Sequence, residues 1–459
     1  MTRVSRRQFL GGALGAAAAV SLGSLPLRLL ASAGKKAGDF QITDIERYEI
    51  MPPYHDYNGE TLRRYHGRQI QSRTVLIAKT NVGIEGFGEA WGLGGPDEAT
   101  MNKYIGTSPF DWIGDTANLV MNMIVYDLMG KFLGLPAWKL IGSKKRDWIP
   151  VAAWTVDQHP KALATEVQSV AARGYHWLKY HIGQINNVVD QTAAMQLVAP
   201  KGFKVHYDFN GDSNVEAVFP VLRELEKFPI VGRIEDPIQT TDFAGYRLLR
   251  EKCKIPILLH HAPKEVLAKG VCDGYMAGHA PVGVAAKANA LAEATNTPIM
   301  LQNAGGTINQ AFLAHEVAVF SKATIDHVNL CHLWTEDITV ESMPVVGGSV
   351  RVPSGPGLGV TVDRARLERF ASAPQRRPRP FLVRIRYSGG PTIFARHDPD
   401  RAGHTDDLRF LHRLLGLNVP GPVPGYGNPV VSDFIDERDS EFAELWEKTA
   451  SGAHVVEGR

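Results

Sequence analysis

Val205-His206-Tyr207-Asp208-Phe209-Asn210 and Ile234-Glu235-Asp236-Pro237 are two short apolar runs, each of which reaches an acidic side chain at its end. Their length and their content of β-branched and aromatic residues predict buried strands. The residues between them have the longer spacing of apolar side chains that is typical of a helix, so the two strands are expected to run parallel. Asp208 and Glu235 should then lie side by side at the carboxyl edge of one sheet.

The same alternation of strand-like and helical stretches extends from residue 148 to residue 333. Eight strand-like runs occur, at Ile149–Trp154, Trp177–Ile182, Lys204–Phe209, Ile230–Ile234, Ile255–Leu259, Gly274–Ala277, Ile299–Leu301 and His327–Leu330. Eight strands separated by helices predict an α/β fold with a closed parallel barrel. An open, doubly wound sheet is the alternative, and it is disfavoured because no Gly-x-Gly-x-x-Gly follows an early strand.

Two further regions flank the barrel, which should occupy residues 148–360. Residues 40–143 contain strand-like runs at Ile42–Ile50 and Thr74–Thr80, then a turn and a helical region, which together predict an α+β domain. Residues 361–459 are a C-terminal extension with one strand-like run, Phe381–Tyr387, and two helical runs. We expect this extension to pack on the N-terminal domain.

Residues 1–33 have the pattern of an export signal. Ser5-Arg6-Arg7-Gln8-Phe9-Leu10 matches the twin-arginine motif, and Ala31-Ser32-Ala33 is a cleavage-site pattern after a mildly apolar Gly/Ala/Leu stretch. We therefore expect recognition by the twin-arginine export machinery and a periplasmic location in a bacterium. An amphipathic N-terminal helix is the alternative. A stable membrane span is disfavoured because Arg28 and many small residues interrupt the apolar stretch.

The composition excludes several classes of protein and partner. Apolar residues make up 44% and charged residues 21% of the 459 residues, close to the average for soluble globular chains, so wholesale disorder is excluded. The formal net charge of +2 produces no strong field, so nucleic acid is not expected as a partner. The 3 cysteines are widely spaced and support neither a disulfide framework nor a zinc site of paired cysteines.

Four motifs, in the same order and spacing, resemble those of the enolase superfamily, in its mandelate racemase and muconate lactonising branch. They are Asn81-Val82-Gly83-Ile84-Glu85-Gly86-Phe87-Gly88-Glu89-Ala90, Tyr126-Asp127-Leu128-Met129-Gly130-Lys131, Ile234-Glu235-Asp236-Pro237 and Pro353-Ser354-Gly355-Pro356-Gly357-Leu358-Gly359. The resemblance covers about residues 40–370. It implies a modified (β/α)7β barrel of the TIM type with an N-terminal α+β capping domain. It also implies a small-molecule carboxylate substrate, whose α-proton is removed with the help of a divalent metal.

The resemblance implies three metal ligands, of which the sequence retains two as carboxylates. Asp208 and Glu235 end the third and fourth barrel strands, and His261 stands where the family has a glutamate after the next strand. Mg²⁺ is the implied ion, but an imidazole ligand also suits Mn²⁺, Fe²⁺ or Zn²⁺. The alternative is that His260 and His261 bind substrate or support a metal held by the two carboxylates alone. Asn210 is expected to face the same side as Asp208 and to bind substrate.

The expected catalytic residues also depart from the family pattern. Lys179 and His181, two residues apart on the second strand, should both face the barrel interior, and either His181 or Lys179 is a candidate base, of which His181 suits a pH near neutral. The family's Asp on the sixth strand and His on the seventh are replaced by Gly278 and Gln302. His279, next to Gly278, is the candidate substitute for the missing pair.

These departures leave two classes of function open. A dehydratase of a hydroxylated, sugar-type acid needs a base on one face of its substrate, whereas a racemase or epimerase needs a proton-transfer group on each face. Loss of the second pair therefore favours the dehydratase. A family member that binds a ligand without catalysis is the alternative. Gln302 and Glu336 are further candidates for substrate binding, and we expect a homo-oligomer.

Overall fold

The computed structural model describes residues 39–66, 71–92, 94–183, 186–211, 213–374, 379–387, 390–398 and 430–458. The segment predicted to be an export signal, residues 1–33, lies outside these ranges. Within them, no helix combines the length and the apolar character needed to cross a membrane.

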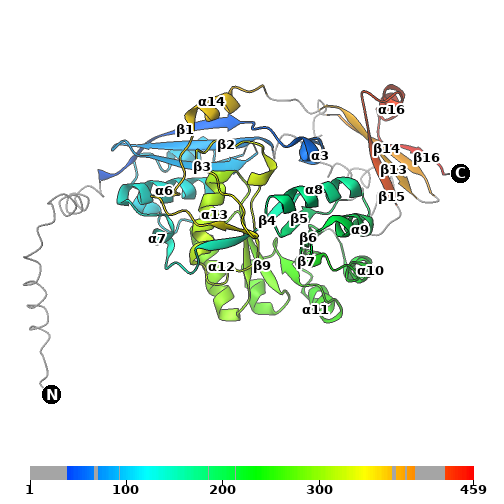
Figure 1. Cartoon of the computed structure of the whole chain (residues 1–459), viewed down its shortest axis with the longest axis horizontal. Helices are drawn as coiled ribbons and strands as arrows, with labels where there is room; N and C mark the ends of the chain where they lie inside the picture. The colour runs from blue at the N-terminus through cyan, green and yellow to red at the C-terminus, as the bar shows by residue number, and fades with distance from the viewer. Residues whose placement is uncertain are drawn as a thin grey trace, which may run out of the picture.

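Eight parallel strands close a barrel in the middle of the chain (Figure 1). They pair in sequence order, and the last strand pairs with the first through His327 and Val151. The strands are β4 (Trp148–Thr155), β5 (Trp177–His181), β6 (Lys204–Asp208), β7 (Val231–Glu235), β8 (Ile257–Leu259), β9 (Gly274–Gly278), β10 (Ile299–Gln302) and β11 (His327–Val328). Each predicted strand-like run overlaps one of them, so the prediction of a closed parallel barrel is confirmed.

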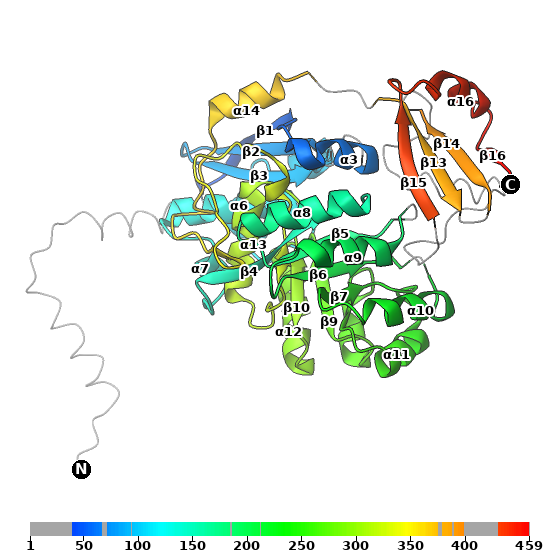
Figure 2. The same cartoon turned by 45° about the vertical axis from the view of Figure 1, so that its right-hand side comes forward.

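Helical segments follow the strands and cover the outside of the barrel (Figures 1 and 2). They are α8 (Pro160–Ala172), α9 (Val188–Val198), α10 (Val215–Leu225), α11 (Phe243–Lys252), the 3-10 helix η3 (Lys264–Lys269), α12 (Val282–Thr295), α13 (Thr307–Val319) and the 3-10 helix η4 (Cys331–Leu333). A short strand after the barrel, β12 (Ser349–Arg351), pairs antiparallel with β4.

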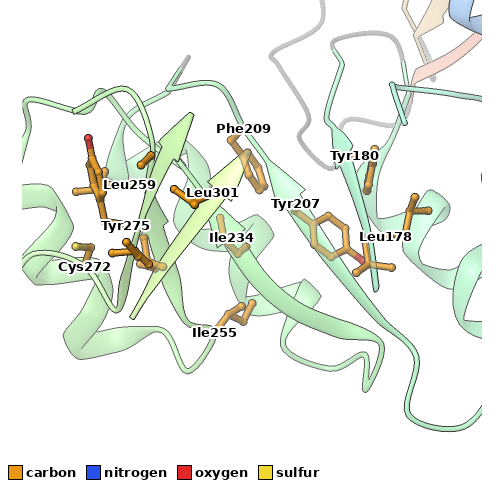
Figure 3. Close-up of a cluster of buried hydrophobic side chains, with 14 of the residues drawn as sticks. Leu178, Tyr180, Tyr207, Phe209, Ile234, Ile255, Leu259, Cys272, Tyr275 and Leu301 are labelled. Atoms are coloured by element: carbon orange, nitrogen blue, oxygen red, sulfur yellow. The ribbon is translucent and has the colours of Figure 1, made fainter. Parts of the chain in front are cut away.

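Alternation along the strands decides which side chains face the helices and which face the barrel interior. Leu178, Tyr180 and Tyr207 are buried in the apolar cluster between strands and helices, where Figure 3 shows them side by side. Lys179 and His181, the alternate residues of β5, therefore point into the barrel. The strand that contributes to the core with one face thus supplies the candidate site with the other.

The N-terminal domain contains an antiparallel sheet of β1 (Ile42–Ile50), β2 (Arg73–Thr80) and β3 (Glu85–Trp91), which confirms the two predicted strands. Helix α6 (Leu119–Leu133) lies very close to β3. A Cβ atom on Gly88 of β3 would come within 2.5 Å of the Val120 carbonyl oxygen, so only glycine leaves room for the helix at this point. The shorter helices around this domain are α5 (Glu98–Asn102), η2 (Pro109–Trp112), α7 (Trp138–Ile141) and α14 (Arg364–Ala371).

Asp127 of α6 connects three of the sequence motifs. Its carboxylate accepts hydrogen bonds from the backbone N–H of Phe87 at 3.0 Å and of Leu358 at 2.8 Å, and it is paired with Lys131 at 2.6 Å. A buried carboxylate needs such partners, since an unpaired charge in the interior is costly. The motifs around residues 86, 127 and 358 therefore meet in one structural junction.

Helix α3 (Asp56–His66), between β1 and β2, was not anticipated from the sequence. It lies beside α8 in both views (Figures 1 and 2), and its Tyr57 and Asn58 donate to Oε1 of Glu166 at 3.3 and 3.4 Å. Gln158 donates to the other oxygen of Glu166 at 3.2 Å. A buried acid thus joins the capping domain to the barrel.

This junction predicts a pH dependence of stability. Burial raises the pKa of Glu166 from 4.5 to about 7, although the hydrogen bonds from Gln158, Asn58 and Tyr57 oppose the rise. Between these two values the folded protein holds a proton that the unfolded chain has released, so stability falls as pH rises towards 7. Replacing Glu166 by Gln should remove this loss, stabilising the variant relative to the parent by up to roughly 3 kcal/mol between pH 5 and pH 8. Urea unfolding at several pH values measures the difference.

The exposed Glu224→Gln variant is the matched control, and its stability should follow that of the parent at every pH. Parallel curves for the parent and the Glu166→Gln variant would contradict the assignment of a raised pKa to Glu166.

The C-terminal extension differs from the prediction, because its described residues form four strands rather than one. The antiparallel sheet has the order β15 (Val430–Asp436), β13 (Phe381–Tyr387), β14 (Thr392–His397), β16 (His454–Val456), and α16 (Phe442–Lys448) covers one face. Phe381 and Val383 on the other face belong to the apolar cluster that contains Leu62 of α3. A peripheral ion pair of 3.8 Å joins Arg438 to Glu60 of the same helix.

Candidate functional site

The carboxyl ends of β5, β6 and β7 bring together Lys179, Asp208 and Glu235. The Nζ atom of Lys179 lies 3.0 Å from Oδ2 of Asp208 and 2.9 Å from each carboxylate oxygen of Glu235. It also donates to Oε1 of Gln302 at 2.9 Å, so the lysine reaches across the barrel from β5 to β10. The structure therefore assembles four of the residues that the sequence nominated.

Charge complementarity holds this centre together. Burial opposes charge on Lys179, but Asp208 and Glu235 outweigh it and raise the lysine pKa above its usual value. Burial and the neighbouring Glu235 would raise the pKa of Asp208, yet Lys179 and His181 lower it to about 2. The pKa of Glu235 lies well below its usual value because Lys179 and two histidines overcome the effect of burial. Both carboxylates are ionised at neutral pH.

His181 lies at the end of β5, where the barrel opens. Its Nε2 atom is 3.1 Å from Oδ2 of Asp208, its ring meets Trp154 edge to face, and 19% of its side chain is exposed. A carboxylate at this distance orients the imidazole, as in other sites where an acid positions a base. His181 is thus a partly accessible base beside a buried cation.

His206 was missed in the sequence, although period two on β6 places it on the same face as Asp208. Its Nε2 atom lies 2.8 Å from Oε2 of Glu235, and its side chain has no exposed surface. Burial lowers the pKa of His206 to about 4, so the imidazole is neutral. His206 packs beneath the centre against Glu235.

The loop after β8 differs from the prediction for His261. The His261 side chain is 56% exposed, and its Nδ1 atom lies 2.6 Å from Oδ2 of Asp236 rather than facing Asp208 and Glu235. This hydrogen bond raises the pKa of His261. The adjacent His260 turns inward instead, with Nδ1 at 3.0 Å from Oε1 of Glu235. The reason is the backbone of Asp236, whose positive φ of 43° directs its carboxylate to the amides of this loop.

The two positions where the family has an Asp and a His have new partners. A Cβ atom on Gly278 would lie 2.1 Å from Nε2 of His260, so the glycine provides the space that this imidazole occupies. Gln302 accepts the hydrogen bond from Lys179.

His279 adopts a φ of 51° and stacks towards Trp91 of β3, with ring centroids 6.3 Å apart. Burial, aided by His260 and Lys179, lowers the pKa of His279 to about 4.

Asn210 and Glu336 were both expected to bind substrate, and the structure brings only Asn210 to the site. Asn210 has a φ of 56°, and its backbone N–H donates to Oδ1 of Asp208 at 2.9 Å, so it caps the strand end beside the centre. Glu336 is 48% exposed and pairs with Arg369 on the surface, so the structure does not bring it to the site. Asp337, the next residue, turns inward instead and pairs with Arg73 at 2.7 Å.

The predicted metal ligands fit a divalent ion only in part. Asp208 and Glu235 converge, but the ammonium group of Lys179 lies at the point where they meet, and His261 faces away from it. A different group does meet the geometric requirement: ligand atoms of Asp236, His260 and His261 all lie within 4.8 Å of one another. The set of Asp208, Glu235 and His261 stays a prediction, and the chain offers a possible His/Asp site beside it.

Comparison with known proteins agrees with this architecture. Residues 162–366 match the family described as enolase C-terminal domain-like. Most of the barrel is therefore similar to the C-terminal domain of enolase-like proteins. A mandelate racemase/muconate lactonizing family protein from Azoarcus sp. EbN1 superposes on this fold with a TM-score of 0.60, at 21% identity, covering 73% of this chain and 98% of the other. The prediction of an enolase-type barrel with an N-terminal cap is confirmed.

Proteins similar in sequence to this chain include sugar-acid dehydratases. The D-gluconate dehydratase of Thermoproteus tenax is 26% identical over 289 residues, which are 57% of this chain and 58% of that protein. The D-xylonate dehydratase of Haloferax volcanii is 24% identical over 342 residues, which are 62% of this chain and 82% of that protein. The chain thus spans just over half of the first of these enzymes and most of the second.

Proposed function

We propose that this protein is a dehydratase of sugar acids. In this reaction a base removes the proton α to the carboxylate, the β-hydroxyl leaves as water, and the resulting enol becomes a 3-deoxy-2-keto acid. The proposal rests on one arrangement, His181 at the barrel mouth with Asp208 and Lys179 directly beside it. The activities named for the relatives from Thermoproteus tenax and Haloferax volcanii supply the substrate class.

Each residue of this arrangement has a distinct part in the proposed reaction. His181 takes the α-proton, and Asp208 holds its ring in position and favours the imidazolium ion that forms. Lys179 pairs with the carboxylates of Asp208 and Glu235 beneath the site, so that Asp208 keeps its position against His181.

Dehydration is favoured over racemisation because two family positions carry no proton-transfer group. Gly278 has no side chain, and Gln302 is an amide engaged by Lys179. A racemase or epimerase of the same family is the second candidate, and His260 beside Gly278 is the observation that favours it, since its imidazole occupies the space of the missing acid.

The experiment that tests the function is incubation of the protein with D-gluconate or D-xylonate in D₂O. We expect a 3-deoxy-2-keto acid, detected as its semicarbazone, together with deuterium at carbon 3. Deuterium exchange at the α-carbon without keto acid would replace the dehydratase by an epimerase. Neither exchange nor keto acid with any of a panel of sugar acids would reduce the function to ligand binding.

We propose export by the twin-arginine pathway as the route to a periplasmic location, on the motif Ser5-Arg6-Arg7-Gln8-Phe9-Leu10. Replacing Arg6 and Arg7 by Lys should keep the protein in the cytoplasm with its leader uncleaved, as measured by cell fractionation. The same Lys replacements at Arg376 and Arg377 are the control and should leave export unchanged. Equal periplasmic yield in a strain without this pathway would contradict the proposal.

We also propose a divalent metal as the cofactor, which would supply Lewis-acid charge next to the substrate when it is bound. Mg²⁺ is the ion that the family resemblance suggests. The donor atoms of this chain suggest a different ion and a different position.

A further inference from the structure

We infer that Asp236, His260 and His261 form a site for a first-row transition ion such as Zn²⁺ or Co²⁺. The site lies one residue along the chain from the carboxylate that the family would use. The side chains follow β7 and β8, two neighbouring strands of the barrel, so they meet at the carboxyl edge of the sheet. Each offers one ligand atom, and these atoms lie within 4.8 Å of one another.

The backbone holds these ligands in place before any ion binds. Asp236 accepts hydrogen bonds from the backbone N–H groups of His260 at 2.9 Å and His261 at 3.1 Å, so the backbone of both histidines is fixed relative to the carboxylate. The two rings lie 4.1 Å apart between centroids. Gly278 leaves room for His260, which any side chain at that position would displace. Fixed supporting contacts of this kind raise the affinity of metal sites.

The family position next to this site already contains a cation. All four oxygens of Asp208 and Glu235 lie within 3.1 Å of nitrogen atoms of this chain, from Lys179, His181, His206, His260 and the backbone of Asn210. An ion at that point would have to displace the ammonium group of Lys179. At Asp236, by contrast, 56% of the His261 side chain is exposed, so an ion can reach the ligands from solvent.

The donor set selects the class of ion. Mg²⁺ prefers oxygen ligands in octahedral geometry, whereas two imidazole nitrogens and one carboxylate oxygen suit Zn²⁺, Co²⁺, Ni²⁺ or Fe²⁺. Three protein ligands also leave a coordination position open, as in catalytic rather than structural zinc sites. The site can therefore present an ion to a substrate in the barrel mouth.

Calorimetry on the full chain, freed of metal by chelation, tests the inference with Zn²⁺ and Mg²⁺ as titrants. We expect one Zn²⁺ per chain and at least about 100-fold weaker binding of Mg²⁺. His261→Ala and His260→Ala should each weaken Zn²⁺ binding at least about tenfold, since each removes one of three ligands. The visible spectrum of bound Co²⁺ should change in the same variants. Metal binding is measured without turnover, so this result stands apart from the dehydratase assay.

Two controls decide between this site and other sites for the same ion. His176→Ala removes an exposed imidazole at the opposite end of β5 and should leave Zn²⁺ binding unchanged. Asp208→Asn should also leave it unchanged, because Asp208 belongs to the lysine centre. Loss of binding in Asp208→Asn with retention in His261→Ala would overturn the inference in favour of the family position. Absence of Zn²⁺ binding by the folded parent would overturn it outright.

Discussion

Replacing Lys179 by Met should lower the free energy of unfolding by about 3 to 5 kcal/mol, the usual effect of breaking a buried charge pair. The substitution keeps the length and apolar stem of the side chain but removes the ammonium group. Asp208 and Glu235, whose side chains are at most 2% exposed, then lose their shared cation in an environment of low dielectric constant. Urea unfolding of parent and variant, followed by circular dichroism, measures the difference.

Two further variants separate this effect from a general loss of lysine. Lys227→Met removes an ammonium group that is 65% exposed and pairs with Glu224, so it should cost less than about 1 kcal/mol. The double variant Lys179→Met with Glu235→Gln removes one of the two uncompensated charges and should recover part of the lost stability. If Lys179→Met were as stable as Lys227→Met, the buried centre would not hold two ionised carboxylates.

The barrel could be predicted from the sequence because its signals are local. Each strand is a short apolar run followed by a helix, and the alternation on β5 separates Leu178 and Tyr180 from Lys179 and His181 without any knowledge of the rest of the fold. The same rule places Asp208 and Glu235 at strand ends. Four residues of the central cluster were therefore predictable from spacing and family resemblance.

The remaining features of the site depend on contacts between distant strands. The sequence aligns His261 with a family ligand, but the positive φ of Asp236 turns His261 outward and His260 inward. Gly278 reads as a lost catalytic acid, whereas in the structure it makes room for an imidazole from the preceding strand. Neither the orientation of the two histidines nor the role of Gly278 can be predicted from the local sequence, because each depends on how neighbouring loops pack.

Three of the four strands of the C-terminal sheet could not be predicted from the sequence, for a different reason. Its strands carry charged side chains that pair across the sheet, such as Arg384 of β13 with Asp433 of β15 at 2.6 Å. A strand whose exposed face is charged lacks the apolar run that identified the barrel strands. The ion pairs that hold these charged strands together join residues far apart in sequence, and the sequence alone does not reveal which strand is the partner of which.

Replacing His181 by Asn should reduce the rate of sugar-acid dehydration by about 10²- to 10⁴-fold, the range expected for loss of a general base. Asparagine can still hydrogen-bond to Asp208, so the carboxylate at 3.1 Å keeps a partner and the strand end keeps its shape. Substrate affinity should change little, because the proton transfer contributes to the transition state and not to binding. Turnover with D-gluconate or D-xylonate, together with calorimetric substrate binding, measures both quantities.

His176→Asn is the matched control, since it changes the same residue type just before the opposite end of β5 and should retain full turnover. His279→Asn tests the other candidate base: its neutral imidazole stacks towards Trp91 of the capping domain, so its loss should affect substrate binding more than turnover. An active parent whose His181→Asn variant keeps full turnover would exclude His181 as the base. Loss of α-proton exchange in His181→Asn, with exchange retained in His279→Asn, would locate the proton transfer at β5, where Asp208 orients the imidazole and Lys179 provides the neighbouring positive charge.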